Sequence, residues 1–224
     1  MACTDNGKIL LPCPSFTFHG IRNYVFCKAT NWRPLKMNPC DEIVLIVDEQ
    51  NHEVAQVSRR IMREGGLIHR ACYILVFNRS HEIFVQKRTM SKDIYPGYLD
   101  VTTGGVVLAG ESYELSAKRE LAEELGIHKA ELNSLPAQTK LIPSGCKTKL
   151  TSHFDFYHAD ENNRVWGRVF SCTTEGPFVL QPEEVEDGGF LGIETVLALA
   201  EVEHFTPDGI SVLKRFIANH ANFL

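Results

Sequence analysis

The sequence predicts an α+β fold in which a mixed β-sheet lies between helices. Short runs of β-forming residues come in pairs joined by polar residues, which is typical of hairpins. Helical segments with recognisable caps separate these pairs. The chain has 224 residues, of which 44% are hydrophobic and 23% are charged. This length and composition favour one domain core that needs neither disulfides nor a structural metal.

The first part of the ordered pattern predicts two hairpins with a short helix between them. Ser58 is the expected N-cap of the helix Arg59–Glu64, which Gly65 and Gly66 would end. The predicted strands of the two hairpins are Ile43–Asp48, Glu53–Val57, Ala71–Phe77 and Ile83–Lys87.

The second part of the pattern predicts further strands and three more helices. Pro96 and Gly97 mark a turn after Tyr95. Thr206 as N-cap and Pro207 in the first turn predict a last helix that ends near Asn219. The other expected helices are Ser112–Leu125 and Ile193–Glu201, and the other expected strands are Tyr98–Thr103, Phe154–His158, Val165–Cys172 and the short edge Val179–Leu180.

The first forty residues differ in composition from the rest. No acidic residue lies between Asn6 and Cys40, whereas five basic residues do. We expect residues 1–40 to form an irregular arm and residues 41–224 to form the domain. An organelle-targeting segment is the alternative interpretation of the arm. A form of the chain that begins at Met37 would keep the whole predicted domain.

Several classes of protein are disfavoured by the bulk properties. The formal net charge of −5 gives no general electrostatic case for nucleic-acid binding. The sequence contains no run of about 18 apolar residues, so no membrane-spanning helix is predicted. The seven cysteines are odd in number and lack the spacing of metal-binding pairs, so reduced thiols in a cytoplasmic protein are expected. The oligomeric state is open, a homodimer included.

A group of glutamates in the helix Ser112–Leu125 is the most informative feature. Glu120, Glu123 and Glu124 are spaced i, i+3, i+4, so a helix brings them to one side, where they repel one another. Alone, this spacing is more typical of a solvated acidic face on an ordinary surface helix. Hard cations offer the other explanation, because Mg²⁺ and Mn²⁺ prefer clustered oxygen ligands.

The residues around these glutamates add further candidate ligands. Glu111 could supply a fourth carboxylate at the helix start, and Arg119 could pair with Glu123 at i, i+4. Gly104 and Gly105 permit unusual backbone angles, so a loop carbonyl at Gly104 could also reach a metal.

The segment from Gly105 to Ile127 resembles the Nudix box of the Nudix hydrolases. Gly105 is followed by five residues, Glu111, seven residues, and then by Arg119-Glu120-Leu121-x-Glu123-Glu124-x-Gly126-Ile127. The resemblance implies the family's α/β/α sandwich. It also implies hydrolysis of a diphosphate linkage, in a nucleoside diphosphate linked to a group X or in a related small organic diphosphate.

The same resemblance implies roles for individual residues. Glu120, Glu123 and Glu124 would bind Mg²⁺, or Mn²⁺ as a substitute, and one of them or a later glutamate would deprotonate water. Glu111 would assist, and Arg119 would orient a carboxylate. The box leaves the identity of X open, because specificity depends on residues outside it.

Residues 41–127 also resemble the isopentenyl-diphosphate-isomerase-like branch of this superfamily. The likeness includes Leu67-Ile68-His69-Arg70-Ala71 and Tyr95-Pro96-Gly97-Tyr98-Leu99-Asp100. It raises an isomerase as an alternative function, with a non-catalytic nucleotide-binding module as a third. Against the isomerase, Gly104 stands where that branch has its catalytic cysteine, and Asn162 and Arg164 stand at the expected sites of its later glutamates.

Basic residues before the box are candidates for substrate binding. Lys87, Arg88 and Lys92 could contact phosphate oxygens, and the alternative is a solvated basic edge. His69 is either a hydrogen-bonded residue at a strand start or a ligand of metal or substrate. Cys72 is expected to be buried packing rather than a nucleophile.

Two further groups of residues have open roles. The acidic run after the box includes Glu184 and Glu186, either of which could act as a base or a metal ligand, and a charged loop is the alternative. Phe154, Phe156 and Trp166 are expected to pack in the core, with base stacking as the alternative.

Overall fold

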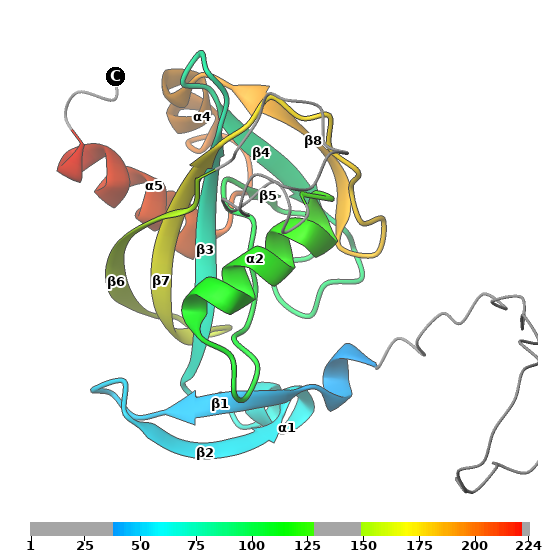
Figure 1. Ribbon diagram of the computed structural model, residues 1–224, viewed down its shortest axis with the longest axis vertical. Helices are drawn as coiled ribbons and strands as arrows, with labels where there is room; N and C mark the ends of the chain where they lie inside the picture. Colours follow the sequence, from blue (N-terminus) through cyan, green and yellow to red (C-terminus); the bar gives the residue numbers. More distant parts are fainter. Residues whose placement is uncertain (1–37, 128–148, 221–224) are drawn as a thin grey trace, which may run out of the picture. The chain divides into compact units, whose positions relative to one another are not determined.

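The computed structural model describes residues 38–127 and 149–220 of the chain (Figure 1). Within these residues an eight-stranded sheet is packed between helices. The arm predicted for residues 1–40 lies outside the described residues except for its end, where Pro39–Asp41 forms the 3₁₀ turn η1. None of the described helices is both long enough and apolar enough to cross a membrane.

The first hairpin and its helix form as the sequence predicts. Strands β1 (Ile43–Val47) and β2 (Glu53–Ser58) pair antiparallel, and α1 (Arg59–Glu64) follows directly. Oγ of Ser58 accepts a hydrogen bond from the backbone N–H of Ile61 at 3.4 Å, so the predicted N-cap is confirmed. Helix α1 is thereby fixed at the end of the hairpin.

Strand β3 (His69–Phe77) is central to the sheet. It runs parallel to β7 along its whole length and pairs antiparallel with β4 at the Phe77–Ile83 bridge. The sheet is therefore mixed, as predicted. The remaining strands are β4 (Ile83–Arg88), β5 (Leu99–Asp100), β6 (Thr151–Ala159), β7 (Arg164–Thr173) and β8 (Val185–Leu191), with β6 beside β7, and both β5 and β8 beside β4.

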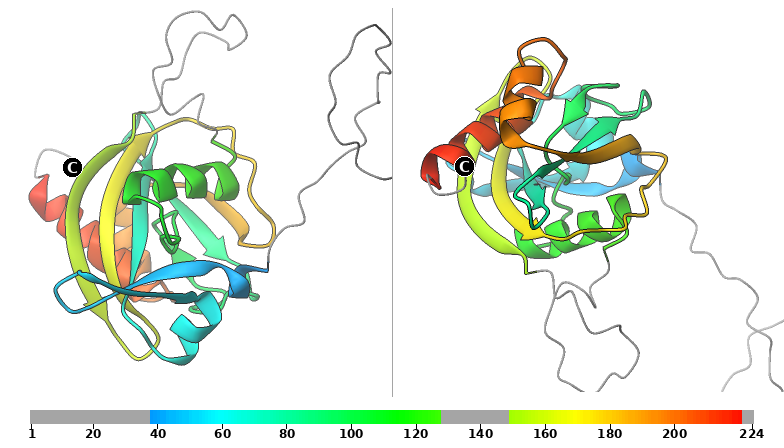
Figure 2. Two further views of the ribbon diagram at one scale, coloured as in Figure 1. Left: turned by 60° about the horizontal axis from the view of Figure 1, so that its bottom comes forward. Right: turned by 90° about the horizontal axis from the view of Figure 1, so that it is seen from above.

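Alternate residues of β3 build two separate cores, one on each face of the sheet. Cys72, Ile74 and Val76 pack against α2 (Tyr113–Glu124). The intervening residues Tyr73, Leu75 and Phe77 pack toward α4 (Ile193–Leu199) and α5 (Pro207–Asn219). This two-residue period is that of a strand buried on both faces. Figure 2 shows α2 on one side of the sheet and α5 on the other, which is the predicted α/β/α sandwich.

The edge strand predicted at Val179–Leu180 is absent from the described residues, and the strand nearby is β8. The backbone N–H groups of Val179 and Gln181 donate to the carbonyls of Leu125 and Glu124, both at 3.1 Å. This segment therefore satisfies carbonyls at the end of α2 instead of joining the sheet. The acidic run is divided: Glu184 lies in the turn before β8, whereas Glu186 lies in β8, which pairs with β4, so the predicted alternative of a charged loop holds only for its first part.

The predicted strand Tyr98–Thr103 is shorter in the structure. Only Leu99–Asp100 pairs with β4 as β5. Beyond it, Thr103 forms a single bridge with Ile74, and the chain then crosses β3 toward α2. The loop of the box thus lies against β3 rather than within the sheet.

Candidate active site

The loop before α2 is held against β3 by backbone hydrogen bonds. Cys72 N–H donates to the Gly105 carbonyl at 2.9 Å, and Ile74 N–H donates to the Thr103 carbonyl at 2.8 Å. The helix then begins at Ser112, whose Oγ accepts from Leu115 N–H at 3.2 Å. These contacts fix the loop and the first turn of α2 relative to the sheet.

The three box glutamates do not share one environment. The side chain of Glu124 is 2% exposed and that of Glu120 is 12% exposed, whereas that of Glu123 is 52% exposed. Glu120 and Glu124 are one helical turn apart, and Oε2 of Glu124 accepts a hydrogen bond from Gly104 N–H at 3.2 Å. The structure therefore turns two of the predicted ligands inward and leaves Glu123 at the solvent side.

Arg119 connects three carboxylates. Its guanidinium donates to Glu120 at 2.8 Å, to Glu123 at 3.1 Å and to Glu111 at 3.1 Å. It also donates to the Val106 carbonyl of the box loop at 3.2 Å. Burial alone would lower the pKa of Arg119, but these carboxylates raise it well above its usual value. Arg119 thus holds Glu120 by an ion pair, a contact that fits the role expected from the family resemblance.

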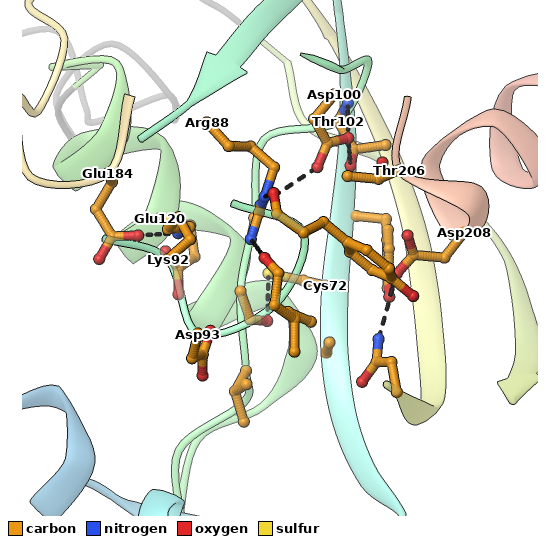
Figure 3. Close-up of a pocket in the computed structure, with 18 of the residues that line it drawn as sticks. Cys72, Arg88, Lys92, Asp93, Asp100, Thr102, Glu120, Glu184, Thr206 and Asp208 are labelled. Carbon is orange, nitrogen blue, oxygen red and sulfur yellow. Dashed lines mark hydrogen bonds and ion pairs between the residues drawn. The ribbon is translucent and has the colours of Figure 1, made fainter. Parts of the chain in front are cut away.

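The inward-facing end of the box meets a cavity of about 80 Å³ (Figure 3). Residues from α1, β3, the segment after β4, the box loop, α2 and the start of α5 line it together. The charged side chains at its wall are Arg59, Arg63, Arg88, Lys92, Asp93, Asp100, Glu120, Glu184 and Asp208.

Lys92 is the cation nearest to the buried glutamate of α2. Its Nζ lies 3.8 Å from Oε1 of Glu124 and forms an ion pair with Oε2 of Glu184. Burial raises the pKa of Glu124 to about 8, because Lys92 only partly offsets it and Glu120 and Glu184 add repulsion. Burial acts in the same direction on Glu184, but Lys92 overcomes it and lowers the pKa of that carboxyl.

The three basic residues predicted to bind substrate are placed differently. Lys92 and Arg88 line the cavity. The guanidinium of Arg88 also donates to the carbonyls of Ile94 and Tyr95, at 2.9 and 3.2 Å, and so supports the loop that carries Lys92. Lys87 is absent from the cavity wall, since neighbouring residues of a strand face opposite sides.

The two candidate acidic residues after the box also separate. Glu184 lines the cavity, whereas Glu186 forms an ion pair with Lys87 at 2.8 Å. Both members of that pair are about half exposed. Of this acidic run, Glu184 is therefore the residue that reaches the candidate site.

Two arginines of α1 also line the cavity, and they are not among the residues predicted for the site. Arg63 Nε lies 2.8 Å from Oδ2 of Asp93, and Arg59 Nε lies 3.6 Å from the same oxygen. Burial raises the pKa of Asp93, but these guanidiniums overcome it and bring it down to about 2. The one available signal is their i, i+4 spacing on a short capped helix, which does not by itself indicate a site.

His69 and Cys72 have structural positions. His69 is 2% exposed, its Nδ1 lies 3.1 Å from the Leu67 carbonyl, and burial lowers its pKa to about 3. It is absent from the cavity wall and fits the interpretation as a hydrogen-bonded residue at a strand start. Cys72 lines the cavity, but burial raises its pKa to about 12 and its Sγ lies 3.6 Å from the Gly105 carbonyl.

The candidate stacking residues pack within the protein instead of lining the cavity. Phe156 meets the ring of Tyr73 edge-on, with 4.9 Å between centroids. Phe154 packs against the same core and lies under the guanidinium of Arg215, at 4.4 Å. Trp166 packs beside the small cluster formed by Leu45, Val47 and Ile68.

The donor chemistry at the buried end of α2 suits a hard divalent cation. Glu120, Glu124 and Glu184 offer only oxygen atoms, and Glu124 experiences repulsion from the other two. In the described part of the chain, no three Asp, Glu, His or Cys side chains lie close enough together to hold a metal ion by themselves. Lys92 and Arg119 supply the positive charge here, and both reach their glutamates through side-chain ion pairs. The residues thus fit Mg²⁺ or Mn²⁺ in kind.

Comparison with known proteins agrees with this arrangement. Residues 67–215 match the model of the NUDIX domain family. The chain is 42% identical to an uncharacterized Nudix hydrolase of Yersinia pestis, over 83% of this chain and 92% of the relative. It is 41% identical to the uncharacterized Nudix hydrolase YfcD of Escherichia coli K12, over 80% of this chain and 89% of the relative.

Solved structures show the same fold. The crystal structure of DR0079 from Deinococcus radiodurans superposes with a TM-score of 0.63 at 22% identity, covering 78% of this chain and 98% of that one. The MutT protein of Methanosarcina mazei superposes with a TM-score of 0.52 at 19% identity, covering 68% and 95%. Together with the family match and the curated relatives, these findings show that the chain belongs to the Nudix hydrolase family.

Proposed function

We propose that this chain hydrolyses a diphosphate linkage of a small organic substrate in a reaction that depends on Mg²⁺, with Mn²⁺ as a substitute. The observation that carries the proposal is the pair of inward-turned glutamates of α2: Glu120 lines the cavity together with Lys92 and Glu184, and the buried Glu124 lies 3.8 Å from Nζ of Lys92. A bound divalent ion supplies positive charge to diphosphate oxygens and makes water more acidic. Carboxylates and cations at one site are what such a reaction needs.

The proposal gives each acidic residue a role. Glu120 and Glu124 hold the ion. Glu123 forms an ion pair with Arg119, which also pairs with Glu120, and so belongs to the same group of carboxylates. Glu111 fixes the other side of that guanidinium. The Gly104 carbonyl is an additional candidate ligand, since Gly104 lines the cavity and its N–H holds Glu124.

Substrate binding and proton removal are assigned to the other cavity residues. Lys92 and Arg88 bind diphosphate oxygens by charge-assisted hydrogen bonds. Glu184 accepts the proton of the attacking water. Its pKa is held low by Lys92, so its basicity rises when Lys92 turns toward the substrate.

The site favours hydrolysis over the isomerase alternative. The isomerase-like branch uses a cysteine for proton transfer at an alkene, and Gly104 stands at the place of that cysteine. Cys72 is the described cysteine at the cavity wall, and its pKa of about 12 keeps it a thiol. A non-catalytic binding module is disfavoured by the buried glutamates, which a binding site for an anionic nucleotide does not require.

The test is hydrolysis by the full chain in the presence of Mg²⁺ or Mn²⁺. Nucleoside triphosphates, nucleotide sugars, dinucleotides, coenzyme A and prenyl diphosphates are incubated with the wild type and with Glu120→Gln, Glu123→Gln and Glu124→Gln. Glu114→Gln is the matched control, because Glu114 lies on the same helix, is half exposed and pairs with Arg168.

We expect turnover by the wild type and the control, and its loss with EDTA. Glu124→Gln and Glu120→Gln should reduce kcat by more than about 100-fold. Replacing a residue that only supports a metal ligand typically costs about 10-fold to 100-fold, and loss of the ligand itself should cost more. Unaltered turnover in both variants would show that this helix does not perform the reaction.

A further inference from the structure

We propose that the end of the cavity opposite Lys92 is a subsite for a compact alcohol with additional hydroxyl groups, so that the substrate is a diphosphate of such a polyol. This inference rests on the proposed function. Figure 3 shows Glu184, Lys92 and Glu120 at one end of the cavity and Thr206 and Asp208 at the other, with Arg88 between them.

The first observation is a buried hydroxyl that has no partner. Thr206 is 1% exposed and lines the cavity, and in the described residues its Oγ1 has no hydrogen-bond partner. Thr206 occupies the N-cap of α5, but its side chain makes no capping bond. Oδ1 of Asp208 instead accepts from Gly209 N–H at 3.1 Å. Because an unsatisfied buried hydroxyl is costly, its persistence at a cavity wall indicates a ligand contact.

The second observation is a buried carboxylate with only neutral donors in the contacts described. Asp208 is 5% exposed, and its Oδ2 accepts from the hydroxyl of Tyr73 at 2.7 Å and from Nδ2 of Asn163 at 3.3 Å. A carboxylate has about four acceptor positions, so Asp208 keeps capacity for one further donor. Tyr73, Asn163 and Asp208 all belong to the cavity wall.

A third group faces the same place. An added Cβ at Gly209 would lie 2.5 Å from Oγ1 of Thr206 and 2.7 Å from Oδ1 of Asp100. The hydroxyl and this second buried carboxylate therefore pack closely around Gly209, where even a methyl group would clash, so glycine at this position lets both oxygens lie beside each other near the cavity. Asp100 is held there by Arg88 at 3.4 Å and by the hydroxyl of Thr102 at 2.7 Å.

A ligand hydroxyl satisfies this set of groups. It can donate to Asp208 and accept from Thr206 at the same time. An alkyl group would leave Thr206 without a partner and the remaining acceptor position of Asp208 unused. An ammonium group would share the cavity with the guanidiniums of Arg88 and Arg63, of which Arg63 donates to Asn163 at 3.3 Å. The whole cavity, with its Lys92 end included, encloses about 80 Å³, far below the roughly 300 Å³ of the smallest usual ligand pockets, so its Thr206 end suits a compact group rather than a nucleoside.

The test compares three diphosphates of equal chain length: propyl, 2,3-dihydroxypropyl and 3-aminopropyl diphosphate. Orthophosphate release by the full chain is measured with Mg²⁺. We expect kcat/KM for the dihydroxypropyl compound to exceed that for the propyl compound by about tenfold or more, since two hydroxyls find partners. An equal rate, or a preference for the propyl or aminopropyl compound, overturns the subsite.

Variants at Thr206 locate the preference. Thr206→Val removes the hydroxyl and should lower the ratio of kcat/KM for the dihydroxypropyl compound to kcat/KM for the propyl compound by about threefold to tenfold, as expected for one hydrogen bond. Thr206→Ser keeps the hydroxyl and should keep the preference. Thr195→Val is the control, because Thr195 lies exposed on α4 away from the cavity. A preference that survives Thr206→Val in a protein of unchanged melting temperature overturns the assignment.

Two readouts separate failure of the subsite from failure of the proposed function. Turnover without a preference rejects the subsite and leaves the hydrolase proposal intact. If none of the three compounds is hydrolysed, calorimetric titration of dihydroxypropyl diphosphate in EDTA still measures binding. Tighter binding than that of propyl diphosphate, lost in Thr206→Val and in Asp208→Asn, supports the subsite, and equal binding rejects it.

Discussion

Nζ of Lys92 lies 3.8 Å from Oε1 of Glu124, so a cation of the cavity wall contacts a buried carboxylate of α2. The two residues are 32 positions apart in the chain, one in the loop after β4 and the other in α2. Lys92 also holds Glu184, which arrives from a third segment. This contact joins the box to residues that no local pattern connects with it, and several predictions depend on it.

Replacement of Lys92 by Met should mainly weaken substrate binding. We expect KM for a hydrolysed diphosphate to rise by about 10-fold to 100-fold, the usual worth of a hydrogen bond to a charged group. Lys87→Met is the matched control, since Lys87 pairs with Glu186 outside the cavity. Steady-state kinetics of both variants decide the matter, and equal KM values for the two would contradict the placement of Lys92.

Gly105→Ala should reduce activity with little loss of stability. The added Cβ would lie 2.4 Å from Oε1 of Glu120, and the end of a side chain can move away more easily than backbone can. We expect kcat to fall by about 10-fold to 100-fold, as when support of a metal ligand is disturbed.

Gly110→Ala should show the opposite behaviour. Gly110 has φ +83° and open space around it, so alanine should cost roughly 1 kcal/mol of unfolding free energy and leave kcat unchanged. Urea unfolding and initial rates of both glycine variants test the pair. If Gly105→Ala loses stability but keeps activity, Glu120 does not need its present position.

Arg63→Gln should raise KM by about tenfold. Arg63 lines the cavity and is oriented there by Asp93 at 2.8 Å, so its charge is available to an anionic substrate. Arg60→Gln is the control on the same helix, because Arg60 is exposed and pairs with Asp41. Comparable KM values for these two variants would exclude α1 from substrate binding.

His69 should make the protein less stable in mild acid. Its pKa is about 3 when folded and about 6.5 when unfolded, so the unfolded chain binds the proton more readily at pH values between these limits. The stability that neutral His69 contributes is complete above pH 6.5 and declines as the pH falls. Between pH 7.5 and pH 5 the loss should be about 2 kcal/mol.

Chemical denaturation across this range tests the effect. His69→Gln cannot titrate, and its unfolding free energy should vary less with pH by about that amount. An identical pH dependence in the wild type and the variant would show that another group is responsible.

Most elements of the fold could be predicted because their signals are local. Runs of β-forming residues predict β3 and β4, and the N-cap residues Ser58 and Thr206 predict where α1 and α5 begin. The same locality explains the errors. Strand β8 contains Gly188, Gly189 and several acidic residues, which are poor β formers, so its partner β4 determines its conformation.

The sequence by itself determined the fold class and the set of acidic residues, because the box spacing depends on helical geometry and a fixed loop length. Only the tertiary structure decided which of them share a cavity. Burial separates Glu124 from Glu123, and strand alternation separates Arg88 from Lys87. Chain reversals bring Arg63, Glu184 and Thr206 to that cavity from distant positions. Such proximity is a property of packing between elements, and it leaves no periodic signal in the sequence.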